Sequence, residues 1–154
     1  MIHEDDLRTI LGWGVVVGID PGTKTGAALY SDGKLTELHT LDTLSLLGWL
    51  AEIQPGLVVI EDSTLTSYLF TAPGSSRAAD MKIARNVGEV DAYCKQIKAV
   101  CGARGIAYRS ISPKDKGAKI KAEQFNGLTG WQGASNQHER DAAMVAWRFR
   151  STKA

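Results

Sequence analysis

The apolar positions of the chain predict five β-strands. Short β-branched runs without polar interruption are typical of buried strands, and residues 14–19 and 57–60 have this pattern. Asp32-Gly33 separates two further runs and is a strong hairpin signal, so the first three strands are expected to form an antiparallel meander. The predicted strands cover residues 14–19, 26–31, 34–41, 57–60 and 106–111.

Four other segments are predicted to be helices; the first two have apolar residues at helical spacing, and the third is basic. The predicted helices cover residues 44–53, 77–103, 114–125 and 136–150. Asp42 or Thr43 can cap the first of them. Asn136, with Glu139 three residues later, has the capping-box pattern at the start of the last helix. Residues 126–135 are rich in glycine and are predicted to be a loop.

The long helix at residues 77–103 carries a sustained apolar seam. Its members follow one another at intervals of four and three residues: Ile83, Val87, Val90, Cys94, Ile97 and Cys101. Packing of this seam against the sheet is the favoured interpretation, and a dimer contact is the alternative.

The order of these elements predicts one α/β domain in which helices flank a mixed five-stranded sheet. Because a helix precedes the strand at residues 57–60, we expect that strand to be parallel to the first one. The 154 residues suffice for one domain with its own core. Residues 1–13 are expected to be a short N-terminal extension.

Charge is distributed unevenly along the chain. Residues 1–80 carry a net charge of −7 and residues 81–154 carry +8. This split favours a basic face for a polyanion, although charges can also fall unevenly on a solvated surface. No apolar run has the length of a signal peptide or a membrane span, so we expect no membrane contact and a cytoplasmic protein, in the host cell if it is viral.

The two cysteines are not expected to form a disulfide with each other. Cys94 and Cys101 are seven residues apart on one predicted helix, which places their Cα atoms about 10.5 Å apart. A disulfide requires less than about 7 Å. Two buried thiols of this kind suit a reducing compartment.

Three carboxylates border apolar stretches of the chain. Asp20 ends the first strand, Glu61 ends the strand at 57–60, and Asp141 lies among small apolar residues of the last helix. A carboxylate in such a place is costly unless it is paired or bound to a cation. Taken singly, they could be a turn residue, a strand end and an exposed helix residue. Together they predict a site for Mg²⁺ or Mn²⁺, which prefer oxygen ligands.

The motifs around these carboxylates resemble a known family. GIDPG at residues 18–22, followed by Thr25-Gly26, resembles the first-strand motif of RuvC-type Holliday junction resolvases, which belong to the RNase H-like superfamily. Val59-Ile60-Glu61 is similar to their second motif, and HERDAA at residues 138–143 is similar to their final helix. Residues 83–88 and 112–116 resemble the family's long helix and the basic segment after it, so the resemblance extends over most of the chain.

The resemblance implies an RNase H-like fold and hydrolysis of a phosphodiester with two Mg²⁺ ions, for which Mn²⁺ can substitute. Asp20, Glu61 and Asp141 would be the metal ligands. His138 lies three residues before Asp141 on the same helix face, so it would ligate metal or assist proton transfer. A histidine that merely starts the helix is the alternative. Glu139 faces away from Asp141 and is interpreted as a cap.

The resemblance also implies contacts to DNA. Basic side chains would lie along the phosphates, although a solvated helix face is the simpler interpretation of such a run. The candidates are Lys114, Lys116, Lys119, Lys121, Arg77, Lys82 and Arg85. Tyr68, Phe70 and Trp131 could stack on unpaired bases, or could be buried as loop anchors. Thr64 stands where some family members have an aromatic wedge, and Asp62 has no role that the sequence assigns.

The predicted function is therefore metal-dependent, structure-selective cleavage of four-way or otherwise branched DNA. A homodimer is expected because a four-way junction has two-fold symmetry. Three alternatives stay open: a flap endonuclease, a YqgF-type RNA nuclease, suggested by DPGTK at residues 20–24, and a non-catalytic DNA-binding module. Sugar kinases and actin-like ATPases share the Asp-x-Gly-Thr pattern, but their folds need two such domains.

Overall fold

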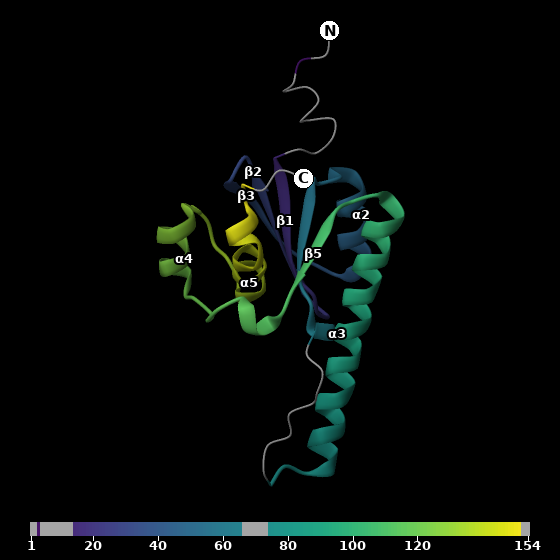
Figure 1. Cartoon of the computed structure of the whole chain (residues 1–154). Helices are drawn as coiled ribbons and strands as arrows, with labels where there is room; N and C mark the ends of the chain where they lie inside the picture. Colours follow the sequence, from purple (N-terminus) through teal and green to yellow (C-terminus); the bar gives the residue numbers. More distant parts are fainter. Residues whose placement is uncertain (1–2, 4–13, 66–73, 152–154) are drawn as a thin grey trace.

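The computed structural model describes residues 3, 14–65 and 74–151 (Figure 1). The strands are β1 (Val15–Asp20), β2 (Thr25–Ser31), β3 (Lys34–Leu41), β4 (Leu57–Glu61) and β5 (Tyr108–Ile111). The α-helices are α2 (Thr43–Ile53), α3 (Arg77–Arg104), α4 (Ala122–Thr129) and α5 (Gln137–Ala146). Short 3₁₀ turns are η1 (Ser63–Leu65), η2 (Pro113–Asp115) and η3 (Trp147–Phe149). The expected N-terminal extension lies outside the described residues, apart from His3.

The five strands form one mixed sheet in the order β3-β2-β1-β4-β5. β1, β2 and β3 pair antiparallel, whereas β4 is parallel to both β1 and β5. Asp32 and Gly33 turn the β2–β3 hairpin with φ angles of 49° and 83°, the left-handed pair that the Asp-Gly signal predicts. The predicted fold class, an α/β domain with a mixed five-stranded sheet flanked by helices, is confirmed.

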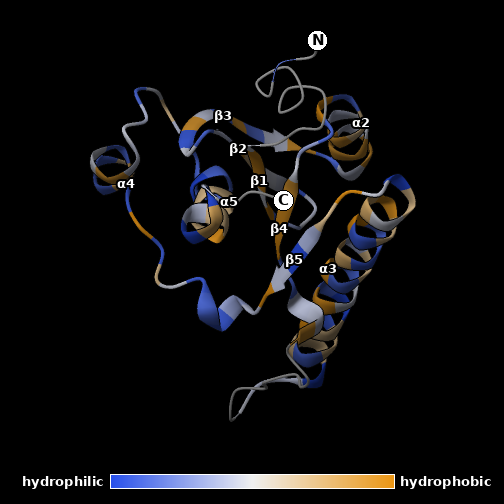
Figure 2. Ribbon diagram, turned by 45° about the horizontal axis from the view of Figure 1, so that its top comes forward, coloured by the Kyte–Doolittle hydropathy of each residue, from blue (hydrophilic) through white to orange (hydrophobic). Residues whose placement is uncertain are grey.

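Helices cover both faces of this sheet (Figure 1). α5 lies against one face with α4 beside it, and α2 and α3 lie against the other face. Successive residues of a strand point to opposite faces. Val16 therefore belongs to the core that contains Phe125, whereas Val17 belongs to the core that contains Leu46 and Ile97. Figure 2 shows hydrophobic residues along the central strands and along the helices that cover them.

The long helix α3 has two unlike halves. Its C-terminal half packs on the sheet through Cys94, Ile97 and Cys101, which are all buried, so the packing interpretation of the seam is confirmed there. Both cysteines are free thiols, as predicted.

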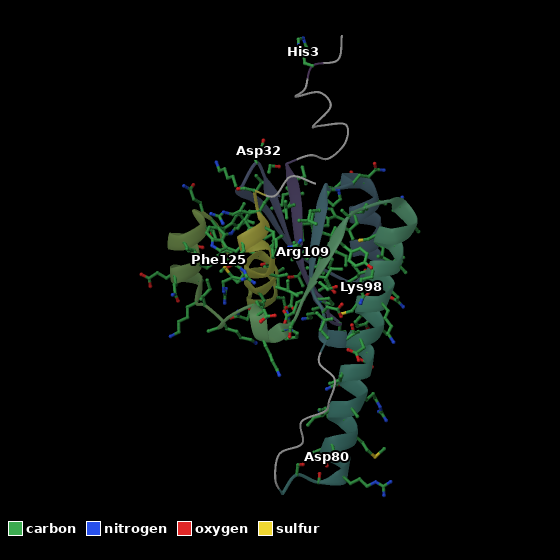
Figure 3. The ribbon with its side chains drawn as sticks, viewed as in Figure 1. His3, Asp32, Asp80, Lys98, Arg109 and Phe125 are labelled. Atoms are coloured by element: carbon green, nitrogen blue, oxygen red, sulfur yellow. The ribbon has the colours of Figure 1, made fainter. Side chains whose placement is uncertain are left out.

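The N-terminal half of α3, residues 77–90, is called the arm below. It projects past the end of the sheet at which β1 and β4 end (Figures 1 and 3, where Asp80 marks its foot and Lys98 the packed half). Ile83 and Val87 continue the apolar seam along the arm, but their side chains are 39% and 37% exposed. The described residues thus leave this part of the seam uncovered.

The predicted helix at residues 114–125 is wrong. The 3₁₀ turn η2 is followed by an irregular segment at residues 116–121, and a helix starts only at α4. Gly117 has a left-handed φ of 91°, and Lys121 is extended at the N-cap of α4. The lysine-rich stretch has too few apolar residues to bury a helix face, and packing of such a face supplies most helix stability in proteins. Phe125 supplies that anchor one turn later, within α4.

Other predicted boundaries also differ, and β5 starts at Tyr108 rather than at residue 106. α4 continues to Thr129, so the predicted loop at 126–135 is helical in its first part. The last helix ends at Ala146 and passes into the 3₁₀ turn η3 rather than continuing to residue 150. None of the helices in the described part of the chain is long and apolar enough to cross a bilayer.

Candidate active site

Asp20 and Glu61 lie at one edge of the sheet. Each is the last residue of its strand, and β1 and β4 are parallel neighbours in which Ile19 is opposite Ile60. Asp141 approaches the same edge from α5. All three carboxylates line one pocket. The side chains that were expected to meet, although they are distant in sequence, therefore do meet.

Two glycines allow α5 to approach the sheet closely. A Cβ atom on Gly18 of β1 would collide with the carbonyl oxygen of Ala142, and one on Gly26 of β2 would collide with that of His138. The phenol of Tyr30 adds a buried hydrogen bond by donating to the carbonyl oxygen of Ala143 at 2.8 Å. This contact places the first turns of α5 beside the end of β1.

The turn after Asp20 is held by a side chain. Gly22 follows Pro21 in this turn, but its φ does not lie in the left-handed region. Instead the buried hydroxyl of Thr25 donates to the carbonyl oxygen of Gly22 at 3.0 Å and accepts from its N–H at 3.3 Å. Thr25 thereby fixes the backbone that follows the first carboxylate.

An ammonium group lies among the carboxylates. Lys116 Nζ is 2.8 Å from Glu61 Oε2 and 3.7 Å from Asp141 Oδ2. Only 11% of the Lys116 side chain is exposed. Lys116 was expected at the DNA phosphates, but its charge faces inward here.

The electrostatics of the pocket reflect this crowding of charge. Burial, together with the charge of Glu61 and a hydrogen bond to it, raises the pKa of Asp20 to about 7. Burial alone would lower the pKa of Lys116, but the hydrogen bond and charge of Glu61, with the charges of Asp141 and Asp20, raise it. Burial and the neighbouring carboxylates thus favour the protonated form of Asp20 in the metal-free pocket.

Asp141 is oriented by residues of its own helix. Gln137 Nε2 donates to Asp141 Oδ1 at 2.8 Å, and Arg140 donates to Gln137 Oε1 at 3.2 Å. Arg140 also donates to the carbonyl oxygens of Ser135 and Ile120, at 2.7 and 3.1 Å. Gln137 was not among the predicted site residues, although its position one helical turn before Asp141 was a usable signal.

The capping box at the start of α5 is formed as predicted. The Asn136 side chain accepts from the Glu139 N–H, and Glu139 Oε1 accepts from the Asn136 N–H, both at 2.9 Å. The interpretation of Glu139 as a cap is confirmed. His138, one residue earlier, is exposed and lines the same pocket as the carboxylates.

The remaining predicted residues lie around this pocket or outside the described chain. Lys119 lines the pocket, as does Lys24, which the sequence analysis did not single out. Lys114 and Lys121 are exposed on the neighbouring segment. The exposed basic residues of the arm are Arg77, Lys82 and Arg85.

The three aromatic candidates have different outcomes. Tyr68 and Phe70 lie outside the described residues. Trp131 is partly buried against the core, and its indole N–H donates to the Ala134 carbonyl oxygen at 3.1 Å. That environment is the one expected of a loop anchor.

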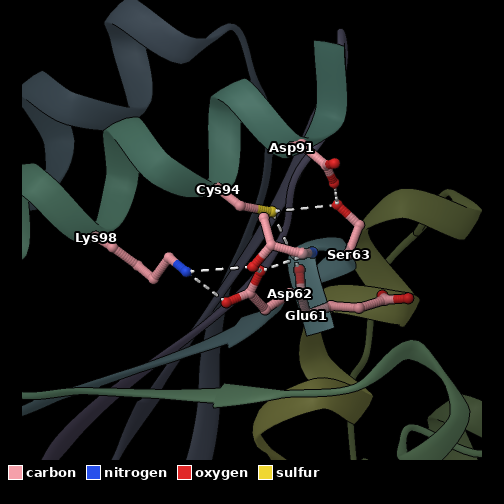
Figure 4. Close-up of polar contacts among 7 residues, drawn as sticks. Glu61, Asp62, Ser63, Asp91, Cys94 and Lys98 are labelled. Carbon is pink, nitrogen blue, oxygen red and sulfur yellow. Dashed lines mark hydrogen bonds and ion pairs between the residues drawn. The ribbon is translucent and has the colours of Figure 1, made fainter. Parts of the chain in front are cut away.

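Asp62, the residue after Glu61, points toward α3, whereas Glu61 points away from it (Figure 4). The fully buried carboxylate of Asp62 accepts from Lys98 Nζ at 2.7 Å and from the Thr64 hydroxyl at 2.5 Å. Burial opposes this charge, but the hydrogen bonds from Lys98, Thr64 and Ser110 outweigh burial and lower the pKa of Asp62.

Further contacts tie the end of β4 to α3. Ser63 donates to Asp91 Oδ1 at 2.6 Å, and the Cys94 thiol donates to the Glu61 carbonyl oxygen at 3.7 Å (Figure 4). The chain at Glu61 and in the two residues after it is thus attached to the long helix. Asp62 therefore has a structural role, which is to attach the end of β4 to α3, and its sequence position did not reveal this role.

The carboxylate oxygens of the pocket are the type of ligand that a hard divalent cation prefers. Three carboxylates face one space, and an ammonium stands among them as a positive charge. Within residues 14–65 and 74–151, no group of three or more His, Cys, Asp or Glu side chains is spaced to hold a metal ion. The carboxylates are arranged around the ammonium of Lys116 instead.

Comparison with known proteins supports the fold. No known family model matches the chain, and no curated protein sequence matches it. Among solved structures, RuvC of T. thermophilus in complex with a Holliday junction substrate is similar, with a TM-score of 0.57 and 16% sequence identity. The match covers 90% of this chain and 98% of that one. The chain therefore has the RNase H-like α/β fold that RuvC has.

Proposed function

We propose that this protein is a metal-dependent endonuclease that cuts four-way DNA junctions. The observation that carries the proposal is the convergence of Asp20, Glu61 and Asp141 on one pocket at the sheet edge of an RNase H-like fold. Branched DNA is favoured as the substrate because the similar RuvC structure was solved with a Holliday junction.

The pocket residues would have different roles in hydrolysis. Asp20, Glu61 and Asp141 would hold Mg²⁺, which would activate a water and neutralise charge on the phosphodiester. Gln137 keeps Asp141 oriented through its hydrogen bond. The exposed imidazole of His138 lines the same pocket and would ligate the metal or assist proton transfer, as the resemblance implies.

The basic residues around the pocket would bind the DNA backbone. Lys24 and Lys119 line the pocket, and Lys114 and Lys121 lie on the neighbouring segment. The arm, which carries Arg77, Lys82 and Arg85, lies at the same end of the sheet (Figure 1). Phosphate contacts give affinity without sequence preference, so binding should weaken steeply with salt.

We also propose that the protein acts as a homodimer through the arm. Met81, Ile83 and Val87 are 55%, 39% and 37% exposed, an unusual apolar content for a helix that projects into solvent. Ile83 and Val87 lie one helical turn apart on the same seam, which a second arm could cover. Two copies would present two pockets to the two opposed strands of a symmetric junction.

Cleavage of labelled substrates tests the proposed function. A four-way junction, a flap, a linear duplex and a structured RNA would be incubated with Mg²⁺ and with EDTA, and Asp141→Asn would serve as the inactive control. Paired cuts near the branch of the junction, dependent on Mg²⁺ and absent in the variant, are expected.

Other outcomes point to the alternatives. Preference for RNA would favour a YqgF-type nuclease, and preference for the flap would favour a flap endonuclease. Tight junction binding without any cleavage in Mg²⁺ or Mn²⁺ would favour a non-catalytic module. Each of these results would contradict the proposal.

A further inference from the structure

The Lys116 ammonium lies among the three carboxylates of the pocket. It contacts Glu61 at 2.8 Å, lies 3.7 Å from Asp141, and contributes to the electrostatics of Asp20 as well. The positive charge of this one side chain therefore acts on all three carboxylates. It also lies in the space toward which those carboxylates converge.

A divalent cation and this ammonium compete for the same oxygens. Glu61 Oε2 cannot donate fully to a metal while it accepts a charged hydrogen bond from Lys116, and two cations in one half-buried pocket repel each other. Metal binding by these three carboxylates is therefore favoured by removal of the ammonium from its position.

The chain around Lys116 allows such a movement. Lys116 begins the irregular segment at residues 116–121, next to Gly117 in its left-handed conformation. The far end of the segment is fixed, because the Ile120 carbonyl oxygen accepts from Arg140. A lysine side chain has a flexible four-carbon stem, so its ammonium can leave while the backbone stays anchored.

We propose that Lys116 is a built-in counterion that holds the carboxylate site together in the absence of metal and is displaced from it when a divalent cation binds. This inference rests on the metal site of the proposed function. Lys116 is a positioning residue in the metal-free state, and metal loading frees its charge for the pocket mouth. A phosphate group could then bind it only after the metal is in place.

The first experiment measures lysine reactivity on the wild-type protein. Reductive methylation followed by mass spectrometry would be performed in EDTA and in saturating Mg²⁺. Lys116 should be protected in EDTA and should react at least about threefold faster in Mg²⁺. Lys119, which lines the same pocket but is exposed, should react alike in both. Protection of Lys116 that persists in saturating Mg²⁺ would overturn the inference.

The second experiment measures Mn²⁺ binding by calorimetry, without DNA. Lys116→Met should bind Mn²⁺ about tenfold more tightly than the wild type, a difference of about 1.4 kcal/mol. Lys119→Met removes an equal charge from the same pocket and should change the affinity much less. The Lys116→Met protein should also melt at a lower temperature than the wild type in EDTA, and Mn²⁺ should restore it.

The outcomes separate this inference from the proposed function. Equal affinity in the wild type and Lys116→Met, or an equal gain in Lys119→Met, would contradict displacement while leaving the metal site intact. Absence of Mn²⁺ binding in all three proteins would remove the metal site, and the proposed function with it. If Lys116→Met fails to fold, the reactivity of the wild-type lysine still decides the question.

Discussion

Glu61 and Asp62 are adjacent in the chain, but their side chains face opposite sides of β4 and have different roles. Glu61 faces the pocket and the ammonium of Lys116, whereas Asp62 faces α3 and is paired with Lys98. A strand places successive side chains on opposite faces, so one dipeptide can serve a polar site on one side and anchor a helix on the other. The end of β4 is therefore positioned by contacts that the pocket itself does not show.

Asp20→Asn is expected to abolish cleavage and to preserve junction binding. The substitution keeps the size of the side chain but removes a negative ligand from the proposed metal site, whereas the basic residues that would bind phosphate are untouched. Cleavage assays and gel-shift titrations of the same preparation measure both properties. Turnover at the wild-type rate would remove Asp20 from the site.

The ion pair of Asp62 and Lys98 should be asymmetric in its effect on stability. Lys98→Met leaves a fully buried carboxylate without its cation and should cost about 3 kcal/mol of unfolding free energy. Asp62→Asn should cost about 1 kcal/mol less, because the Lys98 side chain is 24% exposed and its ammonium can reach water. Urea denaturation of both variants checks the order, and the reverse order would contradict it.

The same pair predicts a dependence on pH. The hydrogen bonds of Asp62 lower its pKa in the folded state below the ordinary value of 3.8, so its charge stabilises the fold above that pH. This contribution is lost as the pH falls through the folded-state pKa. The difference in unfolding free energy between wild type and Asp62→Asn should therefore be constant near neutral pH and shrink below about pH 4. A difference that is unchanged at pH 3 would refute this account of Asp62.

At the scale of elements, close packing of α5 on β1 and β2 positions the pocket. Gly26→Ala places a methyl group against the carbonyl oxygen of His138 and should destabilise the protein by at least about 2 kcal/mol. Because α5 also carries Asp141, cleavage should fall more than stability alone explains. Thermal denaturation and cleavage rates below the melting transition separate the two effects.

Gly48→Ala is the matched control for that substitution. Gly48 lies in α2 with nothing near the added Cβ atom, so alanine should stabilise the helix by up to about 1 kcal/mol and leave cleavage unchanged. Equal effects of the two substitutions would show that the approach of α5 does not position the site.

The elements that the sequence predicted well are those whose apolar pattern is local. The strands and α2 have short, regular patterns with turn or cap signals at their ends, and α3 has a seam over 19 residues from Ile83 to Cys101. The segment after β5 lacks such a pattern. Its path depends on the backbone of Gly117 and on the contact of Arg140 with the Ile120 carbonyl oxygen, which local periodicity does not encode.

The same distinction applies to the site. The order of Asp20, Glu61 and Asp141 predicted their convergence, because strand ends and a facing helix meet at one edge of the sheet. The inward position of Lys116 could not be predicted, since it follows from the irregular path of its segment. The buried pairing of Asp62 depends on Lys98, 36 residues away, which no local pattern connects to it.

For the molecule as a whole, the proposed homodimer depends on contacts between two arms. Ile83→Glu places a charge in the exposed seam and should convert the dimer to a monomer in sedimentation at micromolar concentration. Leu128→Glu is the control, because Leu128 is 48% exposed on α4, away from the arm. A wild-type protein that sediments as a monomer, yet makes paired cuts in one binding event, would contradict the dimer.

The central claim is that Asp20, Glu61 and Asp141 share a divalent cation. Anomalous diffraction from a crystal soaked in Mn²⁺ tests it most directly, because the signal locates the metal without reference to activity. We expect a peak in the pocket with oxygens of all three carboxylates at about 2.1 Å from it. A peak that contacts at most one of them, or no peak at a Mn²⁺ concentration that supports cleavage, would contradict the account.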